Sequence, residues 1–142
     1  MKKWLFAIGI SLFIAFNLAS SPYFPTGYEN VYIDMSRDSL LKARGNHFST
    51  SKLPNGNTIL TEGGSADSLI TKAMYFITPS DTLYEVVIEF ADFFDLEKYM
   101  KDTYGTPNVN GEEWLKKLEN GKELYIWQYQ NRLCIARGDL YR

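Results

Sequence analysis

The chain is poor in the residues that most often build covalent, metal-bound or catalytic sites. Its 142 residues include one cysteine, Cys134, and one histidine, His47. One cysteine excludes a disulfide within the chain, and one histidine excludes a metal site made of several histidines. The sequence also lacks a G-x-S-x-G elbow, a Walker loop, a dinucleotide-binding fingerprint and an H-E-x-x-H pair. We therefore expect no metal and no cofactor, and none of the enzyme classes that depend on these motifs.

Positive charge is also scarce. The 15 basic and 17 acidic residues give a net charge of −2, and no stretch is rich in lysine or arginine. A domain that binds nucleic acid or an anionic membrane surface needs a basic patch. We therefore expect neither as a partner. The charged fraction of 23% and the aromatic fraction of 15% are instead typical of a folded chain that can bury a core.

The first twenty residues have the layout of a secretory signal. Two lysines at positions 2–3 precede an apolar run over residues 4–16, and small residues follow at 19–21. The apolar run is short for a bilayer span, which needs about 20 residues. We therefore expect residues 1–20 to be a signal peptide and the protein to be extracytoplasmic, either periplasmic or secreted. A cut after Ser21 would place Pro22 directly after the cleavage point, so the alternative is an uncleaved membrane anchor over residues 4–19.

The remaining chain divides into a short tether and one domain. Residues 21–33 combine two prolines and a glycine with aromatic residues, which indicates a tether that packs at most as an irregular edge. Residues 34–142 are expected to form a single α+β domain. Its helices are predicted over residues 35–44 and 93–104, because Ser36 and either Asp92 or Asp95 can cap their starts and a glycine follows each end.

Seven strands are predicted between turn-forming residues. Their ranges are 47–53, 57–61, 71–78, 83–90, 113–118, 122–129 and 132–137. Short turns between strands favour an antiparallel sheet of hairpins with the two helices packed on one face. Each predicted helix precedes a hairpin. This order either reflects two repeated units or is a coincidence, because glycine caps and Asn-Gly turns are common in proteins.

The last predicted hairpin is apolar on both faces. A two-residue turn at 130–131 places Tyr125, Trp127, Tyr129 and Arg132 on one face, together with Cys134 and Ala136. The opposite face carries the aliphatic residues Leu124, Ile126, Leu133 and Ile135. We expect the aliphatic face to lie under the helices and the four residues Tyr125, Trp127, Tyr129 and Arg132 to contact a partner, because tyrosine, tryptophan and arginine dominate binding hot spots. The alternative is that the aromatic face packs on the chain's own N-terminal segment.

Other reactive side chains have simpler interpretations. Cys134 lies between Leu133 and Ile135 and is expected to be a small buried hydrophobic residue, although pairing with His47 in a Cys-dependent hydrolase is an alternative. Glu85 and Glu89 share one face of a strand, roughly 13 Å apart, which is too far for a glycosidase pair. We expect them to be solvated, on a strand with only its other face buried.

Each helix is followed by a glycine and a hairpin, and the residues of this pattern are Met35-Ser36, Leu40, Gly45, Leu96, Met100, Tyr104-Gly105-Thr106-Pro107 and Trp114. The pattern resembles small bacterial envelope proteins of the outer-membrane-assembly lipoprotein and β-lactamase-inhibitor-like fold. The chain departs from the family in lacking the lipid-bearing cysteine, in Arg44 where leucine is usual, and in Asn46-His47 where a small residue and proline are usual. The resemblance implies a non-enzymatic protein-binding module.

The expectation for function is therefore an exported, non-enzymatic module of the bacterial cell envelope that binds an envelope protein or peptide. The alternatives are a small secreted Cys-dependent hydrolase and a membrane-tethered structural subunit.

Overall fold

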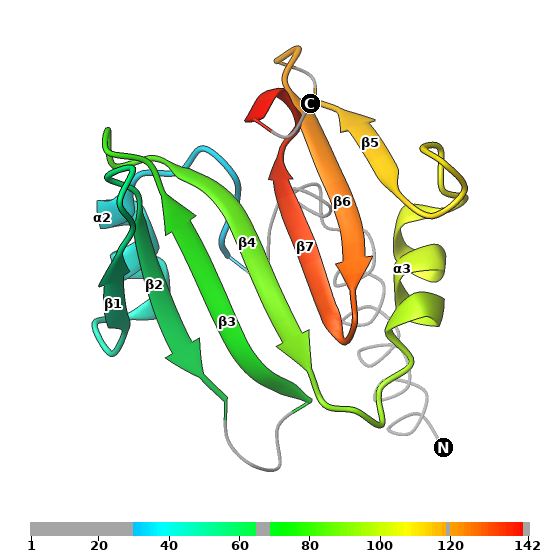
Figure 1. The fold of residues 1–142 in the computed structure, drawn as a ribbon, viewed down its shortest axis with the longest axis horizontal. Helices are drawn as coiled ribbons and strands as arrows, with labels where there is room; N and C mark the ends of the chain where they lie inside the picture. The colour runs from blue at the N-terminus through cyan, green and yellow to red at the C-terminus, as the bar shows by residue number, and fades with distance from the viewer. Residues whose placement is uncertain (1–29, 65–68, 119, 141–142) are drawn as a thin grey trace, which may run out of the picture.

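A seven-stranded antiparallel sheet organises the chain (Figure 1). The computed structural model describes residues 30–64, 69–118 and 120–140. The strands are β1 Ser49–Lys52, β2 Thr58–Gly63, β3 Ile70–Ile77, β4 Leu83–Phe90, β5 Trp114–Lys117, β6 Glu123–Tyr129 and β7 Arg132–Arg137, and they lie in the order β1-β2-β3-β4-β7-β6-β5. Two helices, α2 Arg37–Arg44 and α3 Leu96–Tyr104, and the short 3-10 helix η1 Gly138–Leu140 complete it. The predicted α+β class is confirmed.

Helix α2 begins and ends at the residues whose chemistry favours those positions. The Ser36 hydroxyl accepts a hydrogen bond from the Ser39 backbone N–H at 3.1 Å, which satisfies one of the unpaired donors of the first turn. Gly45 ends the helix at φ 93°, and its N–H donates to the Leu41 carbonyl at 2.7 Å. Only glycine adopts this backbone conformation without strain. The cap residues expected from the sequence are therefore the ones used.

Helix α3 begins later than the sequence predicted. Residues 93–95 do not continue the helix, because the Asp95 carboxylate is the N-cap and accepts from the Lys98 N–H at 3.0 Å. Ahead of it, the Phe94 N–H donates to the Ala91 carbonyl in a turn, and the Phe94 ring stacks on Phe90 at 4.8 Å. The prediction of a helix from Phe93 was therefore wrong by three residues.

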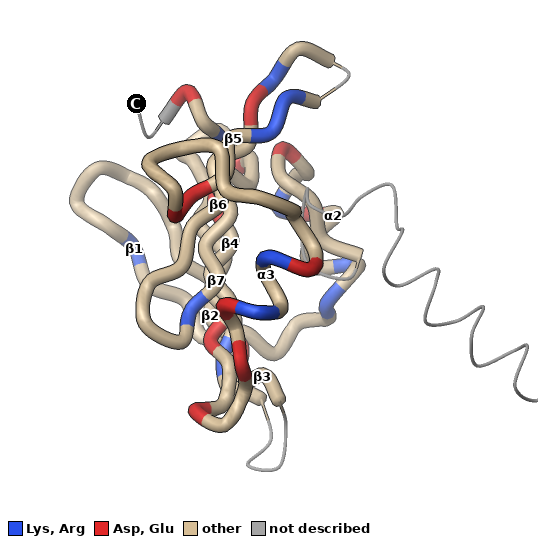
Figure 2. Tube along the Cα trace, turned by 90° about the vertical axis from the view of Figure 1, so that its right-hand side faces the viewer, with Lys and Arg blue, Asp and Glu red and all other residues tan. Residues whose placement is uncertain are grey.

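One hydrophobic core lies between the two helices and one face of the sheet, which we call the inner face. Leu40 of α2 and Met100 of α3 are fully buried in the same cluster of side chains. A row of paired residues crosses the sheet beneath them: Leu60, Tyr75, Val86, Ile135, Ile126 and Trp114. Figure 2 shows both helices on one side of the sheet, with charged residues along α3. The expected placement of the helices on one face agrees with this arrangement.

Strand β4 is buried on both faces, contrary to the prediction of a half-buried strand. It lies in the middle of the sheet, between β3 and β7, so that large neighbouring side chains cover both of its surfaces. A bulge adds a further difference, because Ile77 pairs with Leu83 while Phe76 pairs with Glu85. The bulged Tyr84 consequently contacts the ring of Phe76, at 6.1 Å between centroids, and leaves the inner face that the alternation assigned to it.

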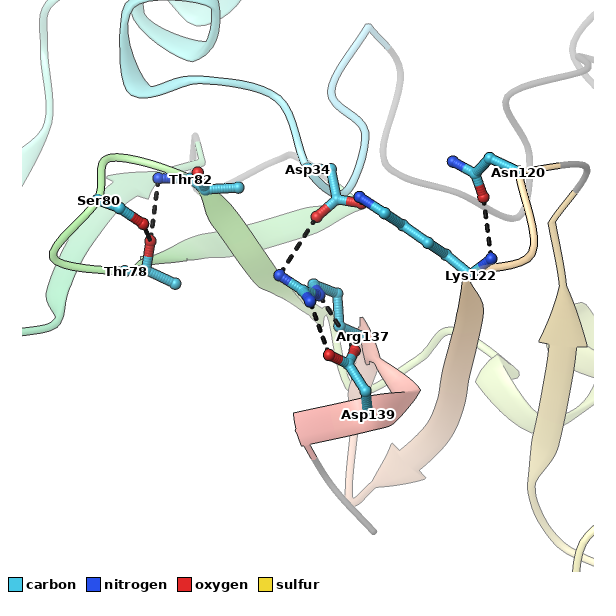
Figure 3. Close-up of polar contacts among 8 residues, drawn as sticks. All are labelled: Asp34, Thr78, Ser80, Thr82, Asn120, Lys122, Arg137 and Asp139. Atoms are coloured by element: carbon cyan, nitrogen blue, oxygen red, sulfur yellow. Dashed lines mark hydrogen bonds and ion pairs between the residues drawn. The ribbon is translucent and has the colours of Figure 1, made fainter.

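The segment before α2 contacts both halves of the sheet, the half with β1 to β4 and the half with β5 to β7 (Figure 3). Its Asp34 has a left-handed φ of 78°, and its N–H donates to the Leu83 carbonyl at 2.8 Å. The Asp34 carboxylate lies 2.6 Å from the Lys122 ammonium and 3.6 Å from the Arg137 guanidinium. Asp34 therefore links β4 to the ends of β6 and β7.

Most of the predicted signal peptide and tether lies outside the described residues. This holds for the signal peptide over residues 1–20 and for residues 21–29 of the predicted tether. The last part of that tether is described, and its Val31 and Ile33 are buried in the core. Among the described residues, no helix is long and apolar enough to cross a membrane.

Candidate functional site

The last hairpin has the two faces that the sequence predicted. Tyr129 pairs with Arg132 and Trp127 with Cys134, across a two-residue turn in which Gln130 has a φ of 55°. Ile126 and Leu133 point into the core and are at most 2% exposed. Because side chains alternate along a strand, the aromatic residues of β6 lie on the opposite surface of the sheet, which we call the outer face.

The aromatic residues of β6 form a continuous row on the outer face. Tyr125 and Trp127 are half-buried and their rings lie 5.4 Å apart, whereas Tyr129 is 56% exposed. The Tyr125 hydroxyl donates a hydrogen bond to the Glu113 carboxylate beside β5. The ring of Tyr125 is thus fixed at both ends, while Tyr129 extends into solvent at the end of the row.

The outer face carries apolar residues beyond those predicted from the last hairpin. The strands β2 and β3 continue it with the half-buried apolar residues Ile59, Met74 and Phe76. Alternation along β3 accounts for their position, because Ala73, Tyr75 and Ile77 are buried in the core and the residues between them point to the outer face. Paired strands lie about 4.8 Å apart, so β2 and the aromatic row of β6 lie about 19 Å apart, with β4 and β7 between them.

Arg132 is held in an ion pair at one end of the outer face. Its Nε donates to the Glu89 carboxylate at 2.8 Å, and the Thr71 hydroxyl donates to the other oxygen at 3.2 Å. The hydrogen bond from Arg132 is the main cause that lowers the pKa of Glu89. Glu89 is therefore not simply a solvated strand charge, as the sequence suggested, but the partner that orients a predicted contact residue.

The centre of the outer face is buried. Val87, Cys134 and Ala136 are at most 6% exposed. Glu85 is 7% exposed, so the prediction that this carboxylate is solvated was wrong. It lies on the central strand of the sheet, where the neighbouring strands shield both of its sides from water.

The Cys134 thiol does not have the surroundings of a nucleophile. Burial raises its pKa to about 12, which keeps it in the unreactive thiol form at neutral pH. His47 lies 3.8 Å from Glu62, a residue that alternates with the core residue Leu60 and so belongs to the inner face. Cys134 pairs with Trp127 on the outer face. The sheet therefore separates the cysteine and the histidine that the hydrolase alternative requires.

A polar cluster that was not predicted from the sequence lies on the inner face. Glu62 is 6% exposed and is surrounded by Arg44, His47 and Tyr75. These residues come from three separate segments of the chain, 44–47, β2 and β3, so no local motif could have revealed them. In the described part of the chain, no group of three or more His, Cys, Asp or Glu residues is arranged to hold a metal ion.

No protein-family model, curated protein or solved structure matches the chain. The resemblance to small envelope proteins therefore remains a sequence-based expectation.

Proposed function

We propose that the protein is an exported, non-enzymatic module that binds a protein or peptide of the cell envelope through the outer face of its sheet. The observation that carries this proposal is the row Tyr125–Trp127–Tyr129, which lies on the face opposite the two described helices. Aromatic side chains that lie together and partly open to solvent on one face of a sheet are typical of an interaction surface. The signal-like layout of residues 1–20 supports export.

The composition of the outer face supports a protein partner. Tyrosine, tryptophan and arginine are the residues most enriched in hot spots, and here Tyr129 and Arg132 are paired neighbours across β6 and β7. Tyr129 is exposed and available for contact, while Arg132 is already oriented by Glu89 and loses little conformational freedom on binding. The apolar side chains of β2 and β3 extend the surface available to a partner.

The test is a double variant, Trp127→Ala with Tyr129→Ala, compared with Phe93→Ala. Phe93 is 82% exposed and lies outside the sheet, so it controls for the loss of an exposed aromatic ring. Immobilised wild-type and variant chains are incubated with envelope extract, and each captured protein is quantified by mass spectrometry. Because one hot-spot side chain contributes about 2 kcal/mol or more, we expect at least tenfold lower capture by the double variant.

Circular dichroism at increasing temperature establishes that each variant is folded. Equal capture by the wild type and by a folded double variant would reject the outer face as the binding surface. Equal losses of captured protein in the double variant and in Phe93→Ala would also reject it. The effect would then reflect non-specific binding by exposed aromatic rings.

A further inference from the structure

Three turns of the chain contain an asparagine followed by glycine: Asn55-Gly56, Asn110-Gly111 and Asn120-Gly121. Such a pair is prone to spontaneous deamidation, because glycine has no side chain to hinder attack by its backbone nitrogen on the asparagine amide. All three glycines have a positive φ, so this dihedral does not separate the pairs. The hydrogen bonds around them do.

The attacking nitrogen is already engaged in two of the three pairs. The Gly56 N–H donates to the Leu53 carbonyl at 3.0 Å, and the Gly121 N–H donates to the Leu118 carbonyl at 3.0 Å. In both turns glycine is the fourth residue, whose N–H closes a β-turn. Each nitrogen must therefore give up a hydrogen bond before it can react.

The side chains of the same two pairs are also fixed. Asn55 Oδ1 accepts from the Asn57 N–H at 3.0 Å. Asn120 Oδ1 accepts in the same way from the Lys122 N–H at 3.0 Å (Figure 3). These bonds hold each asparagine side chain against the following backbone in a local turn of its own. Rotation of the amide towards the glycine nitrogen would break them.

The pair Asn110-Gly111 has a different place in its turn. The Glu112 N–H donates to the Val109 carbonyl at 3.1 Å, so asparagine and glycine are the two central residues. Their φ values of 51° and 75° are those that a type I′ turn requires. Because the fourth residue closes the turn, the N–H of the third residue, Gly111, is left outside that bond. Both residues are exposed, and within the described part of the chain neither this N–H nor the Asn110 side chain has a hydrogen bond.

We infer that Asn110 is a site of spontaneous deamidation in the folded protein, whereas Asn55 and Asn120 are protected by their turns. The Gly111 nitrogen loses its proton to water and forms a bond to Asn110 Cγ. The bond from Cγ to the side-chain nitrogen breaks, and this nitrogen leaves as ammonia. A second water molecule then opens the cyclic imide, which leaves aspartate or isoaspartate at position 110.

The modified turn would lie beside the outer face. Gly111, Glu112 and Glu113 line a cavity of about 400 Å³, so the new carboxylate adds a third negative charge next to two existing ones. Isoaspartate also adds one backbone atom to the turn that precedes Glu113, the residue that accepts a hydrogen bond from the Tyr125 hydroxyl. An effect on partner binding through Tyr125 would rest on the proposed function, whereas the modification site itself does not.

The test is an incubation of the folded full chain for several days at neutral pH, followed by digestion and mass spectrometry of the three peptides. Deamidation is recorded as the exchange of an amide for a carboxylate, and chromatography separates isoaspartate from aspartate. We expect Asn110 to react at least about tenfold faster than Asn55 or Asn120, because each of these must first break two hydrogen bonds.

Two controls separate the structure from the sequence. In concentrated urea the turns are lost, and all three pairs should react at similar rates. In the variant Asn110→Gln the longer side chain does not form the same imide, so the folded protein should stay almost unmodified, with circular dichroism to confirm its fold. The inference is overturned if Asn55 or Asn120 reacts as fast as Asn110 in the folded chain. It is also overturned if Asn110 stays intact there, or if the order of rates is the same in urea.

Discussion

Removal of Arg44 should destabilise the protein far more than removal of an exposed lysine, because Arg44 compensates a buried charge. Glu62 is 7% exposed at its side chain, and two of the three hydrogen bonds to its Oε1 come from Arg44. In the variant Arg44→Met, only the Tyr75 hydroxyl remains among these donors. The carboxylate must then either stay charged without its cation or take up a proton, and both outcomes cost stability.

The expected loss follows from the burial of the pair. Breaking a buried ion pair by removing one partner costs about 3–5 kcal/mol. Arg44 is 19% exposed, so water reaches one end of the pair and the lower value, about 3 kcal/mol, applies. For a domain of this size that loss lowers the Tm by about 10 °C. In the double variant Arg44→Met, Glu62→Gln the amide oxygen still accepts from Tyr75 and no charge is buried, so about 2 kcal/mol of the loss should be recovered.

Urea unfolding followed by circular dichroism measures the free energy of unfolding of the wild type, both single variants and the double variant. Lys98→Met is the matched control, since Lys98 pairs with Asp102 at the surface and should contribute nothing measurable. Two results would contradict the conclusion that Arg44 compensates a buried charge on Glu62. One is a fall in the free energy of unfolding of less than about 1 kcal/mol in Arg44→Met, and the other is no recovery of stability when Glu62→Gln is added.

Two further predictions concern the pair Gly63-Gly64 and the cysteine. Gly64→Ala places a Cβ atom 1.9 Å from a backbone carbonyl oxygen and should lower the free energy of unfolding by about 1–3 kcal/mol. Gly63→Ala meets no atom within 4 Å and should be neutral or slightly stabilising in urea unfolding, so equal losses at the two positions would contradict the close approach. Because burial raises the pKa of Cys134 to about 12, iodoacetamide at pH 8 should label it only after denaturant is added. Rapid labelling of the folded chain would restore the hydrolase hypothesis.

The sequence was most informative where local chemistry decides the structure. The bounds of β4 and β7 were predicted to the residue, because turn-forming residues flank both strands. Ser36 and Gly45 were predicted as caps for the same reason. The start of α3 was missed because Asp92 and Asp95 are both capable N-caps, and only packing of Phe94 on Phe90 selects the later one.

The long-range arrangement was beyond local reasoning. The sequence indicated that Tyr125, Trp127, Tyr129 and Arg132 share a face, since alternation within one hairpin settles this question. It did not indicate that β4 lies beside β7, because residues more than forty positions apart form that pairing. The burial of Glu85 and the ion pair between Glu89 and Arg132 both follow from it, and both were therefore missed.

The strand order has a consequence for the folding pathway. Apart from the junction of β4 with β7, every neighbouring pair in the sheet is joined by a short connection within its own half of the chain. Closing these short connections costs little conformational entropy. Pairing β4 with β7 costs more, because it closes a loop that contains α3, β5 and β6. We therefore expect the pairing of β4 with β7, and with it the ion pair between Asp34 and Lys122, to form later in folding than the pairings within each half of the sheet.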